Sequence, residues 1–207
     1  MTTRRNSSTD VPTVNEIFYS LQGEGFHTGT PAVFVRLSGC NLRCRFCDTD
    51  HVTGQAMTVE QIALTVNRLS AQAPLLVLTG GEPSLWIDNS FVTTLKSLTG
   101  KTIAIETNGT RHLPDAIDWV TLSPKSAFPG GDREPCVLTC CDELKVVFLG
   151  QDLAQYDHIE AKHRFLQPCF CTDDNERQRQ LRLTIEAVMA HPAWRLSLQT
   201  HRLVGLP

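Results

Sequence analysis

Short apolar runs alternate with polar stretches along almost the whole chain, a pattern typical of buried strands separated by helices or loops. None of these runs approaches the ~20 apolar residues that a membrane span needs. We therefore expect strands at residues 14–19, 32–37, 75–79, 102–106, 119–122, 144–149, 164–167 and 195–199.

Three of the intervening stretches carry helix signals. Thr58 and Gln61 have the spacing of a capping box, and apolar residues follow at helical spacing. Asp88 is placed to cap a second helix with one apolar face. A third helix is expected over about residues 174–189, ending before Pro192 because proline does not continue a helix.

Strands that alternate with helices pair in parallel and indicate an α/β fold. The stretch 123–142 is rich in proline and glycine and is expected to be a loop. Because a complete eightfold barrel usually needs about 250 residues, we expect a partial (incomplete) TIM-type barrel of about six parallel strands with few helices. We expect a single domain over residues 14–207, after a flexible polar tail at 1–13. In such folds the chemistry lies at the carboxyl ends of the strands.

Composition and charge narrow the class of protein. A hydrophobic fraction of 41% and a net charge of −3 are ordinary for a globular protein and argue against an overall basic nucleic-acid binder. The first 13 residues lack the apolar segment of a secretory signal. Eight cysteines without such a signal indicate a reducing, cytoplasmic location, where thiols are metal ligands or core residues. We expect neither a nucleic-acid nor a membrane partner.

Three of the cysteines, Cys40, Cys44 and Cys47, form a C-x3-C-x2-C pattern directly after a predicted strand. A tetrahedral zinc site needs a fourth ligand, for which residues 48–51 offer acidic side chains and a histidine. A [4Fe–4S] cluster held by three cysteines instead leaves one iron open for a substrate or cofactor. The spacing alone leaves both kinds of metal site open.

The same spacing, with the aromatic Phe46 before the last cysteine, resembles the radical S-adenosylmethionine (SAM) superfamily. In that superfamily the open iron is chelated by the amino and carboxylate groups of SAM, and an electron from the cluster cleaves SAM to a 5′-deoxyadenosyl radical. Residues 79–83, TGGEP, resemble the motif that holds the methionine amino group of SAM.

Flanking motifs narrow the resemblance to one family. LQGEG at 21–25 precedes the triad, Arg36 lies on the strand leading into it, Cys47-Asp48-Thr49 closes it, and QTHRLVGLP ends the chain at 199–207. Over residues 14–207 these motifs resemble the 7-carboxy-7-deazaguanine synthases. The resemblance implies a carbon–nitrogen lyase that converts 6-carboxy-5,6,7,8-tetrahydropterin to 7-carboxy-7-deazaguanine and ammonia in queuosine precursor biosynthesis, with SAM used catalytically. It also implies a homodimer and an external reductant, a flavodoxin or ferredoxin.

The resemblance also implies individual roles. Cys40, Cys44 and Cys47 would bind a single [4Fe–4S] cluster, and Thr49 would bind Mg2+, which takes few protein ligands when substrate and water supply the rest. SAM would contact Phe46, Cys47, Asp48, Gly81, Glu82, Ser123, Pro124, Lys125, Gln167, Pro168, Cys169 and Phe170. The pterin would contact Leu21, Gln22, Gly23, Glu24, Arg36, Thr79, Glu106, His201 and Pro207.

The chemistry of several of these residues suits such a substrate. Glu106 would accept hydrogen bonds from pterin N–H groups, while Arg36 offers a two-pronged donor to the substrate carboxylate and His201 a second donor. Most termini are polar and frayed, but residues 203–207 are apolar. We therefore expect this segment to dock and to place the α-carboxylate of Pro207 at the pterin. The alternative is that the segment only covers an apolar edge.

Two other classes of protein share part of this pattern. A glycyl-radical-enzyme activating enzyme has the same triad and often carries extra ferredoxin-like cysteines, which Cys136, Cys140, Cys141, Cys169 and Cys171 would supply. A small non-enzymatic zinc-binding module is the second alternative. The motifs at 21–25 and 199–207 favour the synthase.

Overall fold

The computed structural model describes residues 11–45, 47, 49–125 and 134–207. These residues form one mixed sheet in the order β3-β1-β2-β4-β5-β6-β7-β8-β9. The strands are β1 (Thr13–Leu21), β2 (Pro31–Leu37), β3 (Gln55–Ala56), β4 (Leu75–Gly80), β5 (Thr102–Thr107), β6 (Trp119–Leu122), β7 (Cys140–Phe148), β8 (Glu160–Pro168) and β9 (Arg195–Leu196).

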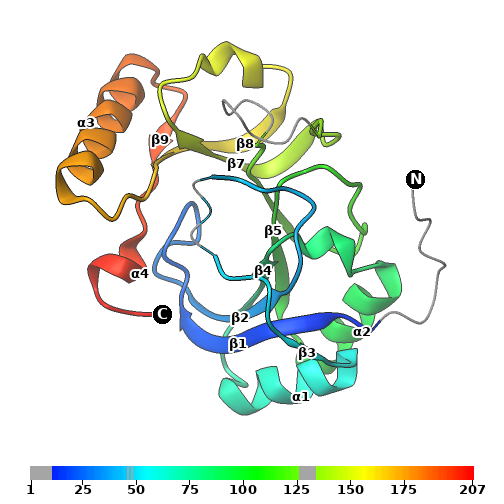
Figure 1. The fold of residues 1–207 in the computed structure, drawn as a ribbon. Helices are drawn as coiled ribbons and strands as arrows, with labels where there is room; N and C mark the ends of the chain where they lie inside the picture. Colours follow the sequence, from blue (N-terminus) through cyan, green and yellow to red (C-terminus); the bar gives the residue numbers. More distant parts are fainter. Residues whose placement is uncertain (1–10, 46, 48, 126–133) are drawn as a thin grey trace.

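From β2 to β9 every neighbouring pair in the sheet is parallel. Figure 1 shows the sheet curving around a central space, and the linear strand order makes it an open, partial barrel. The expected α/β partial barrel is confirmed: β2 and β4–β8 are its six parallel strands, and the short β9 extends them.

The first strand departs from the expected parallel pairing. β1 runs antiparallel to both β2 and β3. A short loop at residues 22–30 joins β1 to β2, whereas a parallel pair needs a crossover of a dozen or more residues. The alternation of strands and helices therefore predicts parallel pairing only from β2 onward.

Three longer helices lie outside the sheet. The capping box of Thr58 and Gln61 starts α1 (Val59–Leu69), and the Asp88 side chain caps α2 (Asn89–Thr99), both as predicted. The third predicted helix is α3 (Asp174–Ala190), which ends at His191. Figure 1 shows α1 and α2 over one half of the curved sheet and α3 over the other half.

The core lies mainly between the sheet and these helices. Ile62 and Val66 of α1 and Val92 and Leu95 of α2 are fully buried against the apolar residues of β2, β4 and β5. A second cluster packs α3 against β7 and β8. On the other face of the sheet, a smaller cluster contains Ala32, Phe34, Leu75, Val77 and Ala104. These residues precede the carboxyl ends of their strands, so those ends are left to polar side chains.

Two predicted elements have different bounds in the structure. The stretch expected to be a loop as far as residue 142 already contains the first residues of β7, which begins at Cys140. The strand expected over 195–199 ends at Leu196, and a short helix α4 (Thr200–Leu203) follows. Two 3-10 helices, η1 (Pro83–Leu85) and η2 (Leu153–Tyr156), complete the fold. In the part of the chain that the structure describes, no helix is long and apolar enough to cross a membrane.

Candidate active site

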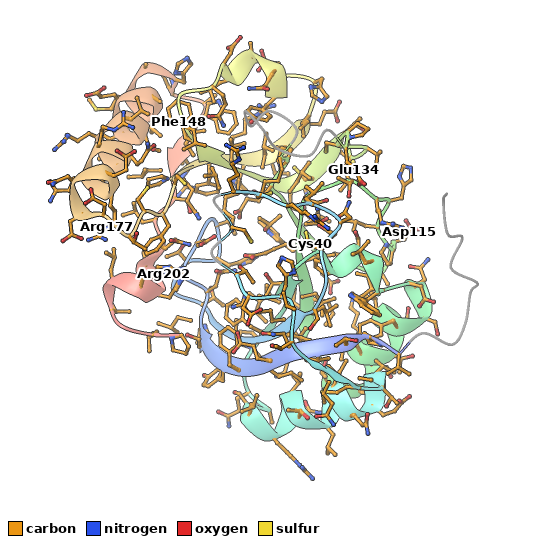
Figure 2. All side chains as sticks on the ribbon, viewed as in Figure 1. Cys40, Asp115, Glu134, Phe148, Arg177 and Arg202 are labelled. Carbon is orange, nitrogen blue, oxygen red and sulfur yellow. The ribbon has the colours of Figure 1, made fainter. Side chains whose placement is uncertain are left out.

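A cavity of about 430 Å³ opens at the carboxyl ends of the parallel strands. Figure 2 shows Cys40 near the middle of the molecule, within the curve of the sheet. Most of the predicted site residues line this one cavity: Leu21, Gln22, Gly23, Glu24, Arg36, Cys40, Cys44, Cys47, Thr49, Thr79, Gly81, Glu106, Ser123, Lys125, Gln167, Pro168, Cys169, Phe170, His201 and Pro207. Glu82 and Pro124 are buried and do not line it. Phe46 and Asp48 lie outside the described residues.

The cysteine triad occupies one side of the cavity. Cys40, Cys44 and Cys47 are all thiols, none in a disulfide, and Cys47 is exposed. Leu42 donates its main-chain N–H to Cys40 Sγ at 3.4 Å. Burial raises the pKa of the Cys40 thiol, so a bound metal is needed to hold it as a thiolate at neutral pH.

Among the described residues, no group of three His, Cys, Asp or Glu side chains converges on a single metal ion. A [4Fe–4S] cube does not require such convergence, because each thiolate binds a different iron. Three thiols on one loop, facing one cavity, therefore suit a cluster with one open iron. The residues present fit the cofactor that the spacing implies.

The turn after β4 packs directly on the loop that carries Cys40. Gly81 donates its N–H to the Leu37 carbonyl, and Glu82 donates its N–H to the Gly39 carbonyl, both at 2.9 Å. A Cβ on residue 81 would lie 2.0 Å from the Gly39 oxygen, so only glycine allows this approach. The GGEP motif is thus held against the cysteine loop.

Glu82 faces the protein interior and is only 1% exposed. Its carboxylate accepts hydrogen bonds from the Thr107 hydroxyl at 2.7 Å, from the Asn108 N–H at 2.7 Å and from the Ser84 N–H at 3.0 Å. These contacts join the end of β4 to the end of β5. A direct contact between Glu82 and SAM stays a prediction, whereas its role in holding the GGEP turn is visible in the structure.

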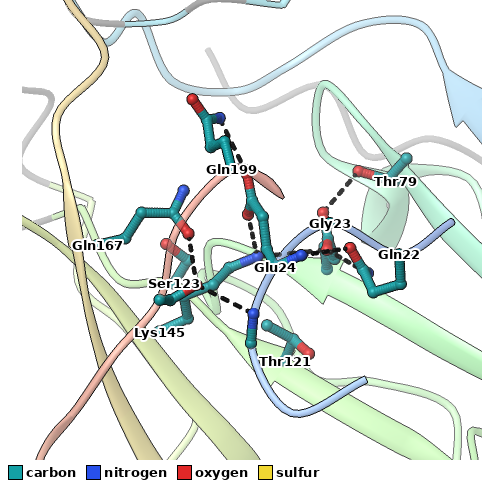
Figure 3. Close-up of polar contacts among 12 residues, drawn as sticks. Gln22, Gly23, Glu24, Thr79, Thr121, Ser123, Lys145, Gln167 and Gln199 are labelled. Carbon is teal, nitrogen blue, oxygen red and sulfur yellow. Dashed lines mark hydrogen bonds and ion pairs between the residues drawn. The ribbon is translucent and has the colours of Figure 1, made fainter. Parts of the chain in front are cut away.

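Six further side chains that line the cavity are polar and come from distant parts of the chain. We call this group the polar wall; its members are Gln22, Glu24, Thr79, Glu106, Lys145 and Gln199. Lys145 Nζ lies 2.5 Å from Glu24 Oε2 and 3.3 Å from Glu106 Oε1. Figure 3 shows Glu24 between Lys145 and Gln199, linked to both.

The charges of the polar wall stabilise one another. Burial would raise the pKa of Glu24, but the charge and hydrogen bond of Lys145, with a hydrogen bond from Gln199, lower it to about 2. Burial would lower the pKa of Lys145, but Glu106, Glu24 and Glu143 raise it well above its usual range. At neutral pH Glu24 therefore presents a charged carboxylate to the cavity.

Ser123 and Lys125, after β6, lie at another part of the cavity. The Lys125 ammonium donates to the Ser123 carbonyl at 2.8 Å and to its hydroxyl at 2.5 Å. Burial lowers the pKa of Lys125. An anionic ligand group would offset the cost of burying this cation, which suits the carboxylate of SAM. Gln167, also predicted to contact SAM, accepts a hydrogen bond from the Ser197 hydroxyl at 2.9 Å.

The two predicted ligands of the substrate carboxylate reach the cavity from β2 and from α4. Arg36 Nε lies 2.6 Å from Glu16 Oε1, and its guanidinium lies 5.6 Å from the centroid of the Phe18 ring. Burial lowers the pKa of His201, so its ring is neutral at pH 7. Thr49, the predicted Mg2+ ligand, also lines the cavity.

The last segment of the sequence returns to the cavity, but in a form that differs from the expected one. Leu203 and Val204 are 74% and 67% exposed, so this segment does not bury its apolar side chains. It is held instead by polar contacts: Thr200 donates its N–H and its hydroxyl to the Gly23 carbonyl, at 3.0 and 2.8 Å. Pro207 lines the cavity, and its main-chain oxygen accepts a hydrogen bond from the Ser20 hydroxyl at 3.0 Å.

Comparisons with known proteins agree with this arrangement. Residues 34–130 match the model of the radical SAM superfamily. The chain is 53% identical to a 7-carboxy-7-deazaguanine synthase of Bacteroides thetaiotaomicron, over 93% of this chain and 97% of the relative. The chain belongs to the 7-carboxy-7-deazaguanine synthase family.

Other members of the 7-carboxy-7-deazaguanine synthase family match over nearly their full length. The synthase of Burkholderia multivorans is 39% identical over 94% of this chain and 98% of its own. The crystal structure of QueE from Escherichia coli superposes with a TM-score of 0.72 at 29% identity, covering 95% of this chain and all of that one. These matches favour the synthase over the activating enzyme and the zinc module that the cysteine spacing left open.

Sequence reasoning assigned no site role to several polar residues of this cavity, among them Lys145, Gln199 and Asn108, and family membership does not by itself reveal their contacts. Asn108 donates from its side chain to Asn41 Oδ1 at 3.1 Å, next to the cysteine triad. The sequence does indicate that Lys145 is unusual, because it is a charged residue inside a predicted apolar strand. The residues with which it pairs are distant in the sequence and could not be predicted from it.

Proposed function

We propose that this chain is a radical SAM enzyme that converts 6-carboxy-5,6,7,8-tetrahydropterin to 7-carboxy-7-deazaguanine with release of ammonia, in queuosine precursor biosynthesis. It is then a carbon–nitrogen lyase. One observation carries the proposal: the cysteine triad and the polar wall line the same cavity. The cavity that would bind the cofactor thus also has hydrogen-bonding groups for a flat, polar heterocycle.

The cofactor side follows from the residues that fit it. Cys40, Cys44 and Cys47 would hold the cluster, and Lys125 and Gln167 would contact SAM; all five residues line the cavity. When bound, the cluster and SAM would supply the radical chemistry that activates C6 of the substrate. The chain contributes orientation and shielding, because the GGEP turn is fixed against the cysteine loop.

The substrate side separates two kinds of recognition. Glu24 and Glu106 accept hydrogen bonds from the N–H groups of the pterin, with further polar atoms from Gln22 and from the main chain of Pro207. Arg36 and His201 would bind the carboxylate at C6, and Thr49 would hold Mg2+ through its hydroxyl oxygen. All three residues line the same cavity.

Three further statements are carried over from the family resemblance. The chain functions as a homodimer, an external flavodoxin or ferredoxin delivers the electron, and the protein works in the cytoplasm. Sedimentation of the reconstituted protein tests the dimer: a single species at the mass of two chains is expected, and a monomer would contradict it.

The test of the activity is anaerobic incubation of the reconstituted protein with 6-carboxy-5,6,7,8-tetrahydropterin, SAM, Mg2+ and a reductant. Mass spectrometry should detect 7-carboxy-7-deazaguanine. The Cys44→Ala variant is the matched control and should form none, because it lacks one cluster ligand. A wild-type protein that contains the cluster and cleaves SAM but leaves the pterin unchanged would refute the proposed substrate.

A further inference from the structure

Lys145 is a buried cation on the wall of the cavity, with a side chain that is only 7% exposed. Charged and titratable groups from several elements surround it. They are Glu24 from the loop after β1, Glu106 from β5, Glu143 from β7 itself, Lys125 from the segment after β6 and His201 from α4. Of the three carboxylates, only Glu24 and Glu106 line the cavity.

We propose that Lys145 is a positioning residue for pterin recognition: it holds the Glu24 and Glu106 carboxylates close together and offsets their charge, so that both act as hydrogen-bond acceptors toward the ligand. This inference rests on the proposed pterin substrate. Lys145 acts through the two carboxylates, and the two carboxylates contact the ligand.

The geometry shows how the pair is oriented. Lys145 lies against one oxygen of each carboxylate. The second oxygen of Glu24 accepts a hydrogen bond from Gln199 at 2.9 Å, and the second oxygen of Glu106 accepts one from the Thr79 hydroxyl at 3.1 Å. Each carboxylate is thus fixed from two sides. A carboxylate oxygen accepts more than one hydrogen bond, so both keep acceptor capacity for a ligand in the cavity.

The charge balance shows why a cation is needed. Two carboxylates that share a partly buried site repel each other, and without compensation one of them takes up a proton. A protonated carboxyl group would present an O–H donor where the pterin also presents donors. Lys145 balances one negative charge and leaves one in excess. That excess favours a ligand edge with several N–H donors, such as the aminopyrimidinone edge of a pterin.

Glu143 has a different role from the other two carboxylates. It is 2% exposed, and it accepts a hydrogen bond from the Phe26 N–H at 2.9 Å. Gly25 has a φ of 65°, and a Cβ there would lie 1.9 Å from Glu143 Oε1. Glu143 therefore anchors the loop that carries Glu24. Burial raises its pKa, and it does not line the cavity.

The experiment compares the Lys145→Met holoenzyme with the wild type between about pH 6 and pH 9. The variant keeps an unbranched side chain of nearly the same length and removes its charge. We expect its KM for the pterin to rise at least about tenfold at neutral pH and to fall as pH rises, because the second carboxylate then ionises. In the wild type KM should change little over this range. Lys162→Met is the matched control, since Lys162 forms an exposed ion pair with Asp142.

Two readouts separate positioning from general damage. The iron content and SAM affinity of Lys145→Met should match the wild type, because the cysteine triad is untouched. In the double variant Lys145→Met with Glu24→Gln, no carboxylate pair remains, so the pH dependence of KM should disappear. An unchanged KM in Lys145→Met, a KM raised equally at all pH values, or a double variant as pH-dependent as the single one would each overturn the inference.

Two further measurements test the inference if Lys145→Met does not fold or if the wild type does not turn over the pterin. If Lys145→Met does not fold, Glu106→Gln tests the same balance: KM should rise but stay independent of pH, and a pH-dependent KM would overturn the inference. If the wild type turns over no pterin, the proposed function fails separately. Calorimetric binding of the oxidised analogue 6-carboxypterin to the wild type and Lys145→Met then decides the role of Lys145. The inference expects weaker, pH-dependent binding in the variant, and equal binding would overturn it.

Discussion

The carboxylate of Glu82 accepts a hydrogen bond from the main-chain N–H of Asn108 at 2.7 Å, which joins the ends of two neighbouring parallel strands. The same carboxylate binds the Thr107 hydroxyl and the Ser84 N–H. Since the main chain of Glu82 also bonds to Gly39, the end of β5 is linked through this one residue to the loop that carries Cys40. Glu82 thus supports the cofactor side of the cavity from within.

Replacing Glu82 by Ala should destabilise the protein. It leaves three buried donors without their acceptor, and each unsatisfied group costs about 1–3 kcal/mol, so the free energy of unfolding should fall by roughly 3 kcal/mol or more. Denaturant unfolding of the cluster-free protein measures this loss. Glu186→Ala, an exposed position on α3, is the control and should change it by less than about 0.5 kcal/mol. Unchanged stability with lost SAM binding would instead make Glu82 a direct cofactor ligand.

Replacing Arg36 by Met should weaken substrate binding through the C6 carboxylate. Losing one partner of a buried charged hydrogen bond costs about 2–5 kcal/mol, which corresponds to a rise in KM of about 30-fold or more. SAM affinity should be unchanged, and Arg68→Met on the exposed side of α1 should behave as wild type. A pterin without the carboxylate should bind the variant and the wild type equally. A variant that loses affinity equally for both pterins would contradict the assignment.

We expect Thr49 to bind Mg2+ through its hydroxyl oxygen. In Thr49→Ala, half-maximal activity should require more Mg2+ than in the wild type, because a hard oxygen ligand is lost. Thr49→Ser retains the hydroxyl and should respond to Mg2+ like the wild type. Activity titrated against Mg2+ in chelator-treated protein measures both variants, with iron content confirming an intact cluster. Full activity of the wild type after exhaustive chelation would rule out a role for Mg2+.

The ion pair of Glu24 and Lys145 should make the free energy of unfolding decrease at acidic pH. Although burial alone would raise the pKa of Glu24, Lys145 and Gln199 lower it from 4.5 to about 2. The folded protein therefore binds this proton more weakly than the unfolded chain does. The resulting stabilisation is complete above about pH 4.5 and is lost as the pH falls toward 2.

Glu24→Gln removes that titration. Between about pH 5 and pH 3, the free energy of unfolding of the variant should fall less steeply than that of the wild type. Denaturant unfolding of cluster-free protein at several pH values measures the two slopes, so that acid loss of the cluster does not contribute. Parallel slopes would show that Glu24 is not held as an ion pair in the folded protein.

Local chemistry explains which parts of the fold the sequence predicts. The capping box at Thr58 and the cap at Asp88 involve residues three positions apart, so the starts of α1 and α2 follow from the sequence. The antiparallel pairing of β1 depends on how a loop returns along the sheet. The last predicted strand is shortened because Thr200 bonds to Gly23, a partner far away in the sequence. Such contacts leave no periodic signal in the sequence.

The same division applies to the site. The cysteine triad and the GGEP turn are contiguous motifs, and the structure places Cys40, Cys44, Cys47 and Gly81 on one cavity. The polar wall is not contiguous, because Lys145 meets Glu24 and Glu106 only through the order of the strands. A lysine within an apolar strand indicates a buried charge, but it does not indicate which carboxylates pair with that lysine.

The central claim is that the cysteine triad and the polar wall form one active site that acts on the pterin with SAM as a catalytic cofactor. The ratio of 7-carboxy-7-deazaguanine formed to SAM consumed tests this claim most directly, measured by mass spectrometry in one anaerobic reaction with limiting SAM. We predict many product molecules for each SAM molecule consumed, with product absent when the pterin is omitted. Consumption of SAM without 7-carboxy-7-deazaguanine, or of one SAM for every product molecule, would contradict the claim.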